Sequence, residues 1–226
     1  MGRRKLRIPT KVTHSGPAAD ARLAEIGLSA EIITKSVIYG QMQRDGCSAL
    51  DPPTYPGTTG WAATVRQFRD CVIPLLGWKI SNTANFCTTI SPDGEWAVAI
   101  STGNKATGVE SGDSNFKNRG GPLRQRAIER NQRSLFEELE REIPSLILSK
   151  TWVLFIARKG DYVACELKLP LVLDGDGRVE AWAERIMIPT IKLGDVPAET
   201  TRRQGSPKLE DGAKEIDIDV TRRTES

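Results

Sequence analysis

Histidine is almost absent from the chain, which contains a single one, His14, among 226 residues. His14 lies between a basic stretch and the Gly16-Pro17 pair, where we expect the backbone to be mobile. Ser-His-Asp and Cys-His catalysis need an imidazole held firmly against the nucleophile, and zinc and iron sites often need several histidines. The sequence therefore argues against histidine-based chemistry, and it predicts neither a metal site nor another cofactor.

Long hydrophobic runs and paired cysteines are also missing. No apolar stretch approaches the ~18 residues of a membrane span. The basic N-terminus, residues 2–7, has no apolar region behind it, unlike a secretion signal. The four cysteines form no CxxC pair, and they are Cys47, Cys71, Cys87 and Cys165. We therefore expect a cytoplasmic protein with reduced thiols and no membrane partner; the oligomeric state stays open.

Charge is balanced over the whole chain and uneven along it. The net charge is +3, from 32 basic and 29 acidic residues. Residues 1–16 hold five bases and no acid, which predicts a disordered basic arm. Residues 194–226 are polar and slightly acidic, and we expect a disordered tail there, although Ile216, Ile218 and Val220 alternate as in an edge strand. A single domain is predicted between them, over residues 17–193.

The first part of this domain, residues 17–76, has helical periodicity. Apolar residues at helical spacing predict one helix from Ala18 to Gly27 and a second, capped by Ser29, to about Gln43, where β-branched residues leave a strand possible. The turn formers of residues 51–57 predict a surface loop. Thr58 or Thr59 is then expected to cap a third helix that closes near Gly77.

Residues 77–193 change to a period of two, which indicates strands. Five are expected, at residues 85–90, 95–101, 151–158, 161–171 and 178–188. A polar loop, 102–121, and a long helix from Pro122 to about Glu142 separate the second strand from the third. The predicted fold class is therefore α+β, with N-terminal helices followed by a largely antiparallel five-stranded sheet backed by one long helix.

A basic cluster at the start of the long helix is the most unusual local feature. Helix N-termini favour acidic residues, yet residues 117–133 hold six bases and one acid. A glycine pair before a helix start also leaves backbone N–H groups available to an anion. The candidate anion or nucleic-acid contacts are Lys105, with Asn104 beside it, Arg119, Gly120, Gly121, Arg124, Arg126, Arg130 and Arg133. The alternative is that these arginines form a solvated face or pair with acids.

Two further motifs have weaker support. Pro92-Asp93 with Glu166-Leu-Lys168 follows the PD…(D/E)xK pattern of metal-dependent nucleases, in which carboxylates hold a divalent ion. Alternating charge is equally typical of a strand that faces solvent, and the two halves are unusually far apart. Residues 174–180 resemble a calcium loop, but a tight hairpin turn explains them better.

Several short motifs resemble a group of bacterial proteins, common in actinobacteria and on mobile elements, for which no activity is known. The resemblance covers roughly residues 57–190. The motifs that carry it are Gly77-Trp78, Asn85, residues 89–93, 102–104 and 106–108, Asn131-Gln132 and Thr151-Trp152. It implies Asp in place of Asn104 and a Pro-Lys-Gly run near residues 119–121 in relatives. It also implies no lysine at the position of Lys168, which weakens the nuclease interpretation.

These observations leave three classes of function open. The leading hypothesis is a non-enzymatic binding protein from a mobile-element or phage-related context, which uses the basic loop and helix start to bind nucleic acid or a host protein. The alternative is an enzyme acting on a phosphorylated small molecule or nucleotide, with residues 102–121 as the phosphate cradle. The third is a protein inhibitor or scaffold. No catalytic residue is assigned, so the enzyme class stays uncertain, with the balance against it.

Overall fold

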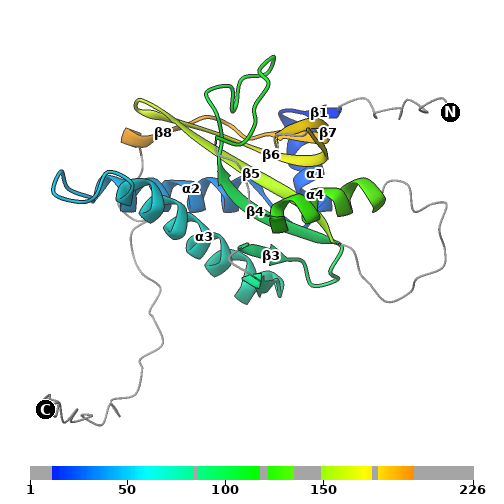
Figure 1. Cartoon of the computed structure of the whole chain (residues 1–226). Helices are drawn as coiled ribbons and strands as arrows, with labels where there is room; N and C mark the ends of the chain where they lie inside the picture. The colour runs from blue at the N-terminus through cyan, green and yellow to red at the C-terminus, as the bar shows by residue number, and fades with distance from the viewer. Residues whose placement is uncertain (1–11, 84–85, 118–121, 135–148, 175–177, 196–226) are drawn as a thin grey trace, which may run out of the picture.

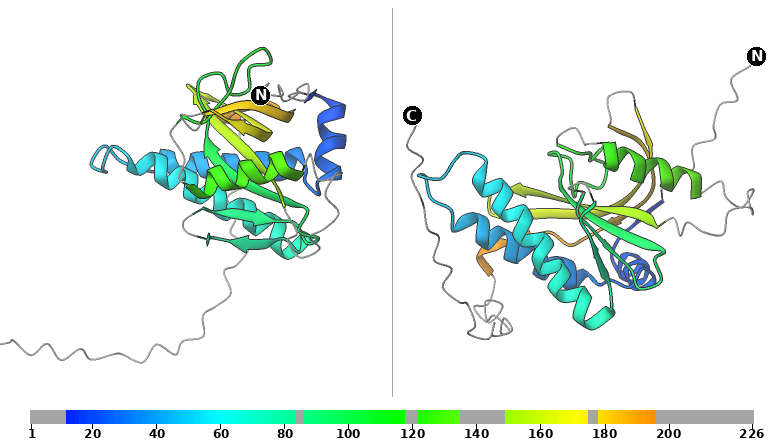
Figure 2. Two further views of the ribbon diagram at one scale, coloured as in Figure 1. Left: turned by 45° about the vertical axis from the view of Figure 1, so that its right-hand side comes forward. Right: turned by 60° about the horizontal axis from the view of Figure 1, so that its bottom comes forward.

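The computed structural model describes residues 12–83, 86–117, 122–134, 149–174 and 178–195. These residues form a sheet with helices on both of its faces (Figure 1; Figure 2). The α+β class expected from the sequence is confirmed. None of the helices within the described ranges is long and apolar enough to cross a membrane.

Three N-terminal helices, α1 (Pro17–Glu25), α2 (Ala30–Asp45) and α3 (Tyr55–Leu76), cover one face of the sheet. The Oγ of Ser29 accepts a hydrogen bond from the Ile32 N–H at 3.2 Å, which caps α2 as expected. The alternative of a strand in this segment is wrong. The expectation that residues 51–57 are all loop is also wrong, because α3 begins at Tyr55, where proline is tolerated in the first turn.

The helices α2 and α3 approach each other closely at Gly40. A Cβ added at Gly40 would lie 2.7 Å from the backbone oxygen of Gly60 and 1.9 Å from the Oγ1 of Thr64. The Thr64 hydroxyl donates to the same Gly60 oxygen at 2.8 Å, so it is held in place. Glycine at position 40 therefore sets how closely the two helices pack.

We expect Gly40→Ala to lower the free energy of unfolding by about 1–3 kcal/mol, the usual cost of overpacking a well-packed interior. Gly46→Ala is the matched control, because a Cβ there would meet its nearest atoms at 3.6 Å, an ordinary contact. Its effect should stay within about 0.5 kcal/mol. Urea unfolding of both variants measures the difference. Equal effects of the two substitutions would show that the helices separate easily.

Eight strands form the sheet within the described residues. They are β1 (Val12–His14), β2 (Lys79–Ser81), β3 (Thr88–Ile90), β4 (Trp96–Thr102), β5 (Lys150–Lys159), β6 (Tyr162–Leu173), β7 (Val179–Met187) and β8 (Ile191–Lys192). The order across the sheet is β1-β7-β6-β5-β4-β3-β2, and β8 pairs with β6 off this path. The five predicted strands correspond to β3 through β7.

The expectation of a largely antiparallel, five-stranded sheet is wrong in two respects. The pairs β4–β5 and β1–β7 are parallel, so the sheet is mixed. The strands β4 and β5 are parallel, and α4 (Pro122–Ser134) lies between them in the chain. A crossover of this kind returns the chain to the end of the sheet at which β4 began, so β5 runs in the same direction as β4. The additional strands β1, β2 and β8 have two or three residues each, too few for a period-two pattern to be recognised.

The two faces of the sheet bury separate hydrophobic clusters. Alternate residues of β5 and β6, such as Leu154 and Leu167, contact α1–α3. Residues of the opposite parity, such as Val153 and Phe155, contact Ile128 of α4 and Phe116 of the loop after β4. The long helix thus backs only one face. Its expected continuation over residues 135–142 lies outside the described residues.

The N-terminal boundary needs one correction. Residues 12–14, placed in the disordered arm on sequence grounds, form β1 beside β7. His14, which we expected to be mobile, therefore has a fixed position, with its Nε2 3.3 Å from a carboxylate oxygen of Glu184. The predictions for residues 1–11 and for 196–226 lie outside the described residues.

Candidate functional site

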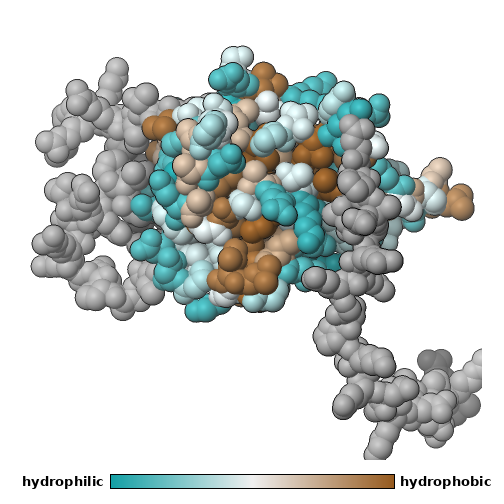
Figure 3. All heavy atoms as spheres, turned by 180° about the vertical axis from the view of Figure 1, so that it is seen from behind, coloured by the Kyte–Doolittle hydropathy of each residue, from teal (hydrophilic) through white to brown (hydrophobic). Residues whose placement is uncertain are grey.

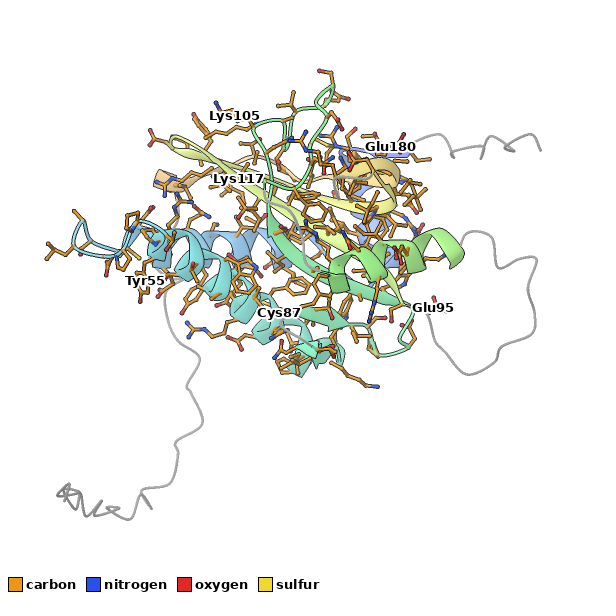
Figure 4. The ribbon with its side chains drawn as sticks, in the orientation of Figure 1. Tyr55, Cys87, Glu95, Lys105, Lys117 and Glu180 are labelled. Atoms are coloured by element: carbon orange, nitrogen blue, oxygen red, sulfur yellow. The ribbon has the colours of Figure 1, made fainter. Side chains whose placement is uncertain are left out.

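The loop that follows β4 returns to the sheet as a narrow hairpin. Gly103 and Phe116 form an isolated antiparallel bridge, and the Lys117 N–H donates to the Thr102 oxygen at 3.2 Å. Further out, the Asn104 N–H donates to the Asn115 oxygen at 3.0 Å. Residues 103–117 are named the β4 loop below. Figure 4 shows this loop above the sheet, with Lys117 at its base and Lys105 farther out.

Asn104 holds the interior of the β4 loop together. Its Oδ1 accepts from the Ala106 N–H at 3.0 Å, and its Nδ2 donates to the Asp113 oxygen at 3.1 Å. Both ends of the amide are therefore occupied within the loop. The expectation that Asn104 contacts an anion together with Lys105 is not supported by this geometry, because the side chain serves the fold of the loop.

Three charged side chains lie fully buried between the sheet and the β4 loop. Glu166 and Lys168 come from β6 and Arg185 from β7, and all three have no exposed surface. Lys168 and Arg185 are directly opposite each other in the β6–β7 register. Two opposed cations in an interior are unfavourable without compensation. These three residues are named the buried charge cluster.

Compensation comes from Glu166 and from backbone oxygens of the loop. The Arg185 Nε donates to the Glu166 carboxylate, while its two terminal nitrogens donate to the oxygens of Val109 and Glu110, each at 2.7 Å. The Lys168 Nζ donates to the backbone oxygen and the Oγ of Ser114, both at 2.8 Å. The buried charge cluster therefore attaches the β4 loop to the sheet at two separate points.

The aromatic residues below the loop complete this attachment. The Lys168 Nζ lies 3.8 Å from the centroid of the Trp182 ring, a cation–π contact that burial strengthens. Phe155 makes edge-to-face contacts with Phe116 and with Trp182, at centroid distances of 4.9 and 5.6 Å. The loop is thus packed onto the sheet by apolar as well as polar contacts.

The start of α4 contacts the base of the loop through Arg124. Its guanidinium carbon lies 3.7 Å from the centroid of the Phe116 ring. Partial burial lowers the pKa of Arg124 to about 10, so the side chain remains charged at neutral pH. Because Arg124 stacks on a loop residue, the first turns of α4 and Lys117 belong to one surface.

Asn131 anchors the other end of α4. Its Nδ2 donates to the oxygens of Thr151 and Pro170, at 2.8 and 2.9 Å, and its Oδ1 accepts from the Thr151 N–H at 2.7 Å. Pro170 has no N–H, so the backbone hydrogen-bond ladder between β5 and β6 cannot continue at this residue. The Asn131 amide takes over these bonds and fixes α4 to the sheet.

The predicted contact residues fall into three groups. Lys105 and Arg126 are exposed, and Arg124 is half-buried against Phe116. Arg130 and Arg133 are on α4, but their side chains are outside the described part. Arg119, Gly120 and Gly121 lie outside the described residues altogether. Exposed acids, namely Glu110, Asp113 and Glu129, are interspersed among the described bases.

The nuclease interpretation is not supported by the arrangement. Glu166 and Lys168 do share a strand face, but this face is buried and Glu166 is paired with Arg185. Asp93 lies in the turn before β4, where it accepts from the Ser91 hydroxyl and, at 2.9 Å, from the Glu95 N–H. Within the described ranges, no three His, Cys, Asp or Glu residues are grouped so as to hold a metal ion.

Two further groups singled out in the sequence are the cysteines and residues 174–180, of which 175–177 lie outside the described residues. All four thiols are free. Burial raises the pKa of Cys165 to about 12, so its thiol is not a nucleophile at neutral pH. Residues 174–180 join the antiparallel strands β6 and β7, and Asp174 Oδ1 accepts from the Arg178 N–H at 2.8 Å. These facts favour the hairpin turn over a calcium loop.

Comparison with protein-family models, with curated proteins and with solved structures gave no match.

Proposed function

We propose that the chain is a non-enzymatic binding protein that contacts nucleic-acid phosphates through the surface formed by the β4 loop and the first turns of α4. The mobile-element context implied by the sequence resemblance is part of this proposal. Lys105, Lys117 and Arg126 supply exposed charge on this surface, and Arg124 adds charge where the loop meets the helix. Phosphate contacts from such cations provide most of the affinity of sequence-independent binding.

The observation that carries the proposal is the rigid support of the β4 loop. A loop of fifteen mostly polar and small residues would normally lose much conformational entropy on binding. Here the buried charge cluster and Asn104 hold its backbone in place before any partner arrives. A surface organised in advance binds more tightly because less ordering remains to be done.

Phosphate contact is favoured over base stacking. Proteins that bind single strands stack bases on exposed aromatic rings. The aromatic residue of the β4 loop, Phe116, is buried between Phe155 and Arg124. We therefore expect duplexes and single strands to bind through their backbones, without a marked preference for base sequence.

The test is fluorescence anisotropy of the purified chain with labelled DNA and RNA, in single- and double-stranded form. Three phosphate contacts predict that affinity falls about 40-fold between ~50 and ~200 mM salt, from a slope of ~0.9 per contact. The Lys105→Glu/Lys117→Glu variant should lose most of this binding and most of its salt dependence. Arg124 is left intact, because its substitution would also disturb the packing of Phe116.

Lys35→Glu is the matched control, since Lys35 is an exposed lysine on α2, which covers the opposite face of the sheet. This variant should bind as the parent does. Equal losses in both variants would mean that only net charge matters, and no binding at ~50 mM salt would reject the proposal. In that case the mixed charges of the surface would favour a protein partner, the other occupant expected from the sequence.

A further inference from the structure

One edge of the sheet combines an open strand with exposed hydrophobic side chains. β2 is the last strand in the order and pairs only with β3 among the described strands. Ile80 on β2 is 56% exposed, and Leu75 and Leu76 at the end of α3 are 81% and 40% exposed. Figure 3 shows hydrophobic atoms gathered at the lower edge of the molecule, at the height where α3 ends in Figure 1. These residues are named the β2 edge.

An edge of this kind is a liability unless something covers it. Unpaired backbone groups beside apolar side chains are a template for pairing with another strand. Successive residues of a strand point to opposite faces, so Ile80 and its neighbour Lys79 offer an apolar face and a basic face. Lys79 is exposed, and within the described part of the chain no carboxylate pairs with it.

We propose that residues 215–220 of the same chain pair with the β2 edge as an additional strand. Their sequence is Glu-Ile-Asp-Ile-Asp-Val, with apolar and acidic residues in strict alternation. In an extended conformation, Ile216, Ile218 and Val220 share one face and the acids share the other. The apolar face would pack against Ile80 and the two leucines at the end of α3, and the acidic face would place carboxylates beside Lys79.

The connecting chain is long enough for this docking. Nineteen residues lie between Asp195, the last described residue, and Glu215, and the twenty steps from one to the other can span up to ~66 Å when extended. A compact domain of this size has a radius of gyration of roughly 16 Å. Because the segment is tethered, its effective concentration at the β2 edge is on the order of millimolar. Even a weak intrinsic affinity for the edge is therefore enough for docking.

The other possible occupants fit less well. The opposite edge strand, β1, offers a single exposed large hydrophobic residue, Val12, to the apolar side of the segment. A second copy that paired through its own β2 would bring Lys79, Ile80 and Ser81, none of which is acidic, to the basic face. The segment 215–220 offers apolar side chains to the Ile80 face and carboxylates to the Lys79 face.

Disulfide trapping in the full-length chain tests the proposal. Cys47 and Cys87, which are partly exposed, are first replaced by serine, and Ile80→Cys is combined in turn with cysteine at each position from 216 to 220. Cysteines at 216, 218 and 220 lie on the Ile80 face and should cross-link within one chain. Those at 217 and 219 point away, so they should cross-link at least about fivefold more slowly. Mass spectrometry at low protein concentration separates links within a chain from links between chains.

A second measurement uses Lys79→Glu in the same cysteine background, which should slow cross-linking about two- to fivefold by placing like charges together. Thermal melting of the Ile80→Cys parent checks that the fold is retained. Equal rates at all five positions, links found only between chains, or no links at all would each overturn the proposal. Links between chains alone would instead identify a second copy as the occupant.

Discussion

Replacing Glu166 by glutamine is expected to lower the free energy of unfolding by about 3–5 kcal/mol, the cost of breaking a buried ion pair by removing one partner. The substitution preserves the shape of the side chain and removes its charge. Arg185 and Lys168 would then remain opposite each other in the interior without the negative charge of Glu166 to compensate them. Urea unfolding followed by tryptophan fluorescence measures the loss.

The matched control is Glu180→Gln, because Glu180 is an exposed glutamate on β7, the strand that also carries Arg185 (Figure 4). Its effect should stay within about 0.5 kcal/mol. The double variant Glu166→Gln/Arg185→Gln should lose less stability than the sum of its single substitutions, since it removes both charges of the pair. If Glu166→Gln cost no more than Glu180→Gln, the cluster would not be what attaches the β4 loop to the sheet.

The burial of this cluster could not be read from the strand that carries most of it. Along β6, apolar residues at 163, 165, 167, 169 and 171 alternate with Ala164, Glu166 and Lys168, which is also the pattern of a strand with one face in water. What buries the second face at Glu166 and Lys168 is the β4 loop, more than fifty residues earlier in the chain. A local pattern shows which residues share a face of the strand, whereas segments distant in the sequence decide which face is buried.

The parallel pairing of β4 and β5 could have been predicted. A strand, a long helix and another strand in succession are typical of a crossover connection, and this signal was present on either side of Pro122. The basic cluster is a different case. Charge patterning identified a basic segment, but it could not distinguish Arg124, which stacks on Phe116, from Arg126, which is exposed. That difference depends on where a ring from another segment lies.

Gly108→Ala is expected to destabilise the chain by about 2–5 kcal/mol, because two costs add at this position. Gly108 has a φ of 72°, where a Cβ costs roughly 1–2 kcal/mol. That Cβ would also lie 2.6 Å from the Cβ of Ala164 on β6, and overpacking adds about 1–3 kcal/mol. Gly160→Ala separates the backbone strain from the overpacking, because Gly160 has a φ of 63° and nothing within 4 Å of an added Cβ. The difference between the variants in urea unfolding therefore measures how tightly the β4 loop lies on the sheet. A loop that moves freely above the sheet would give equal losses, and the rigid support that the proposed binding surface requires would then be absent.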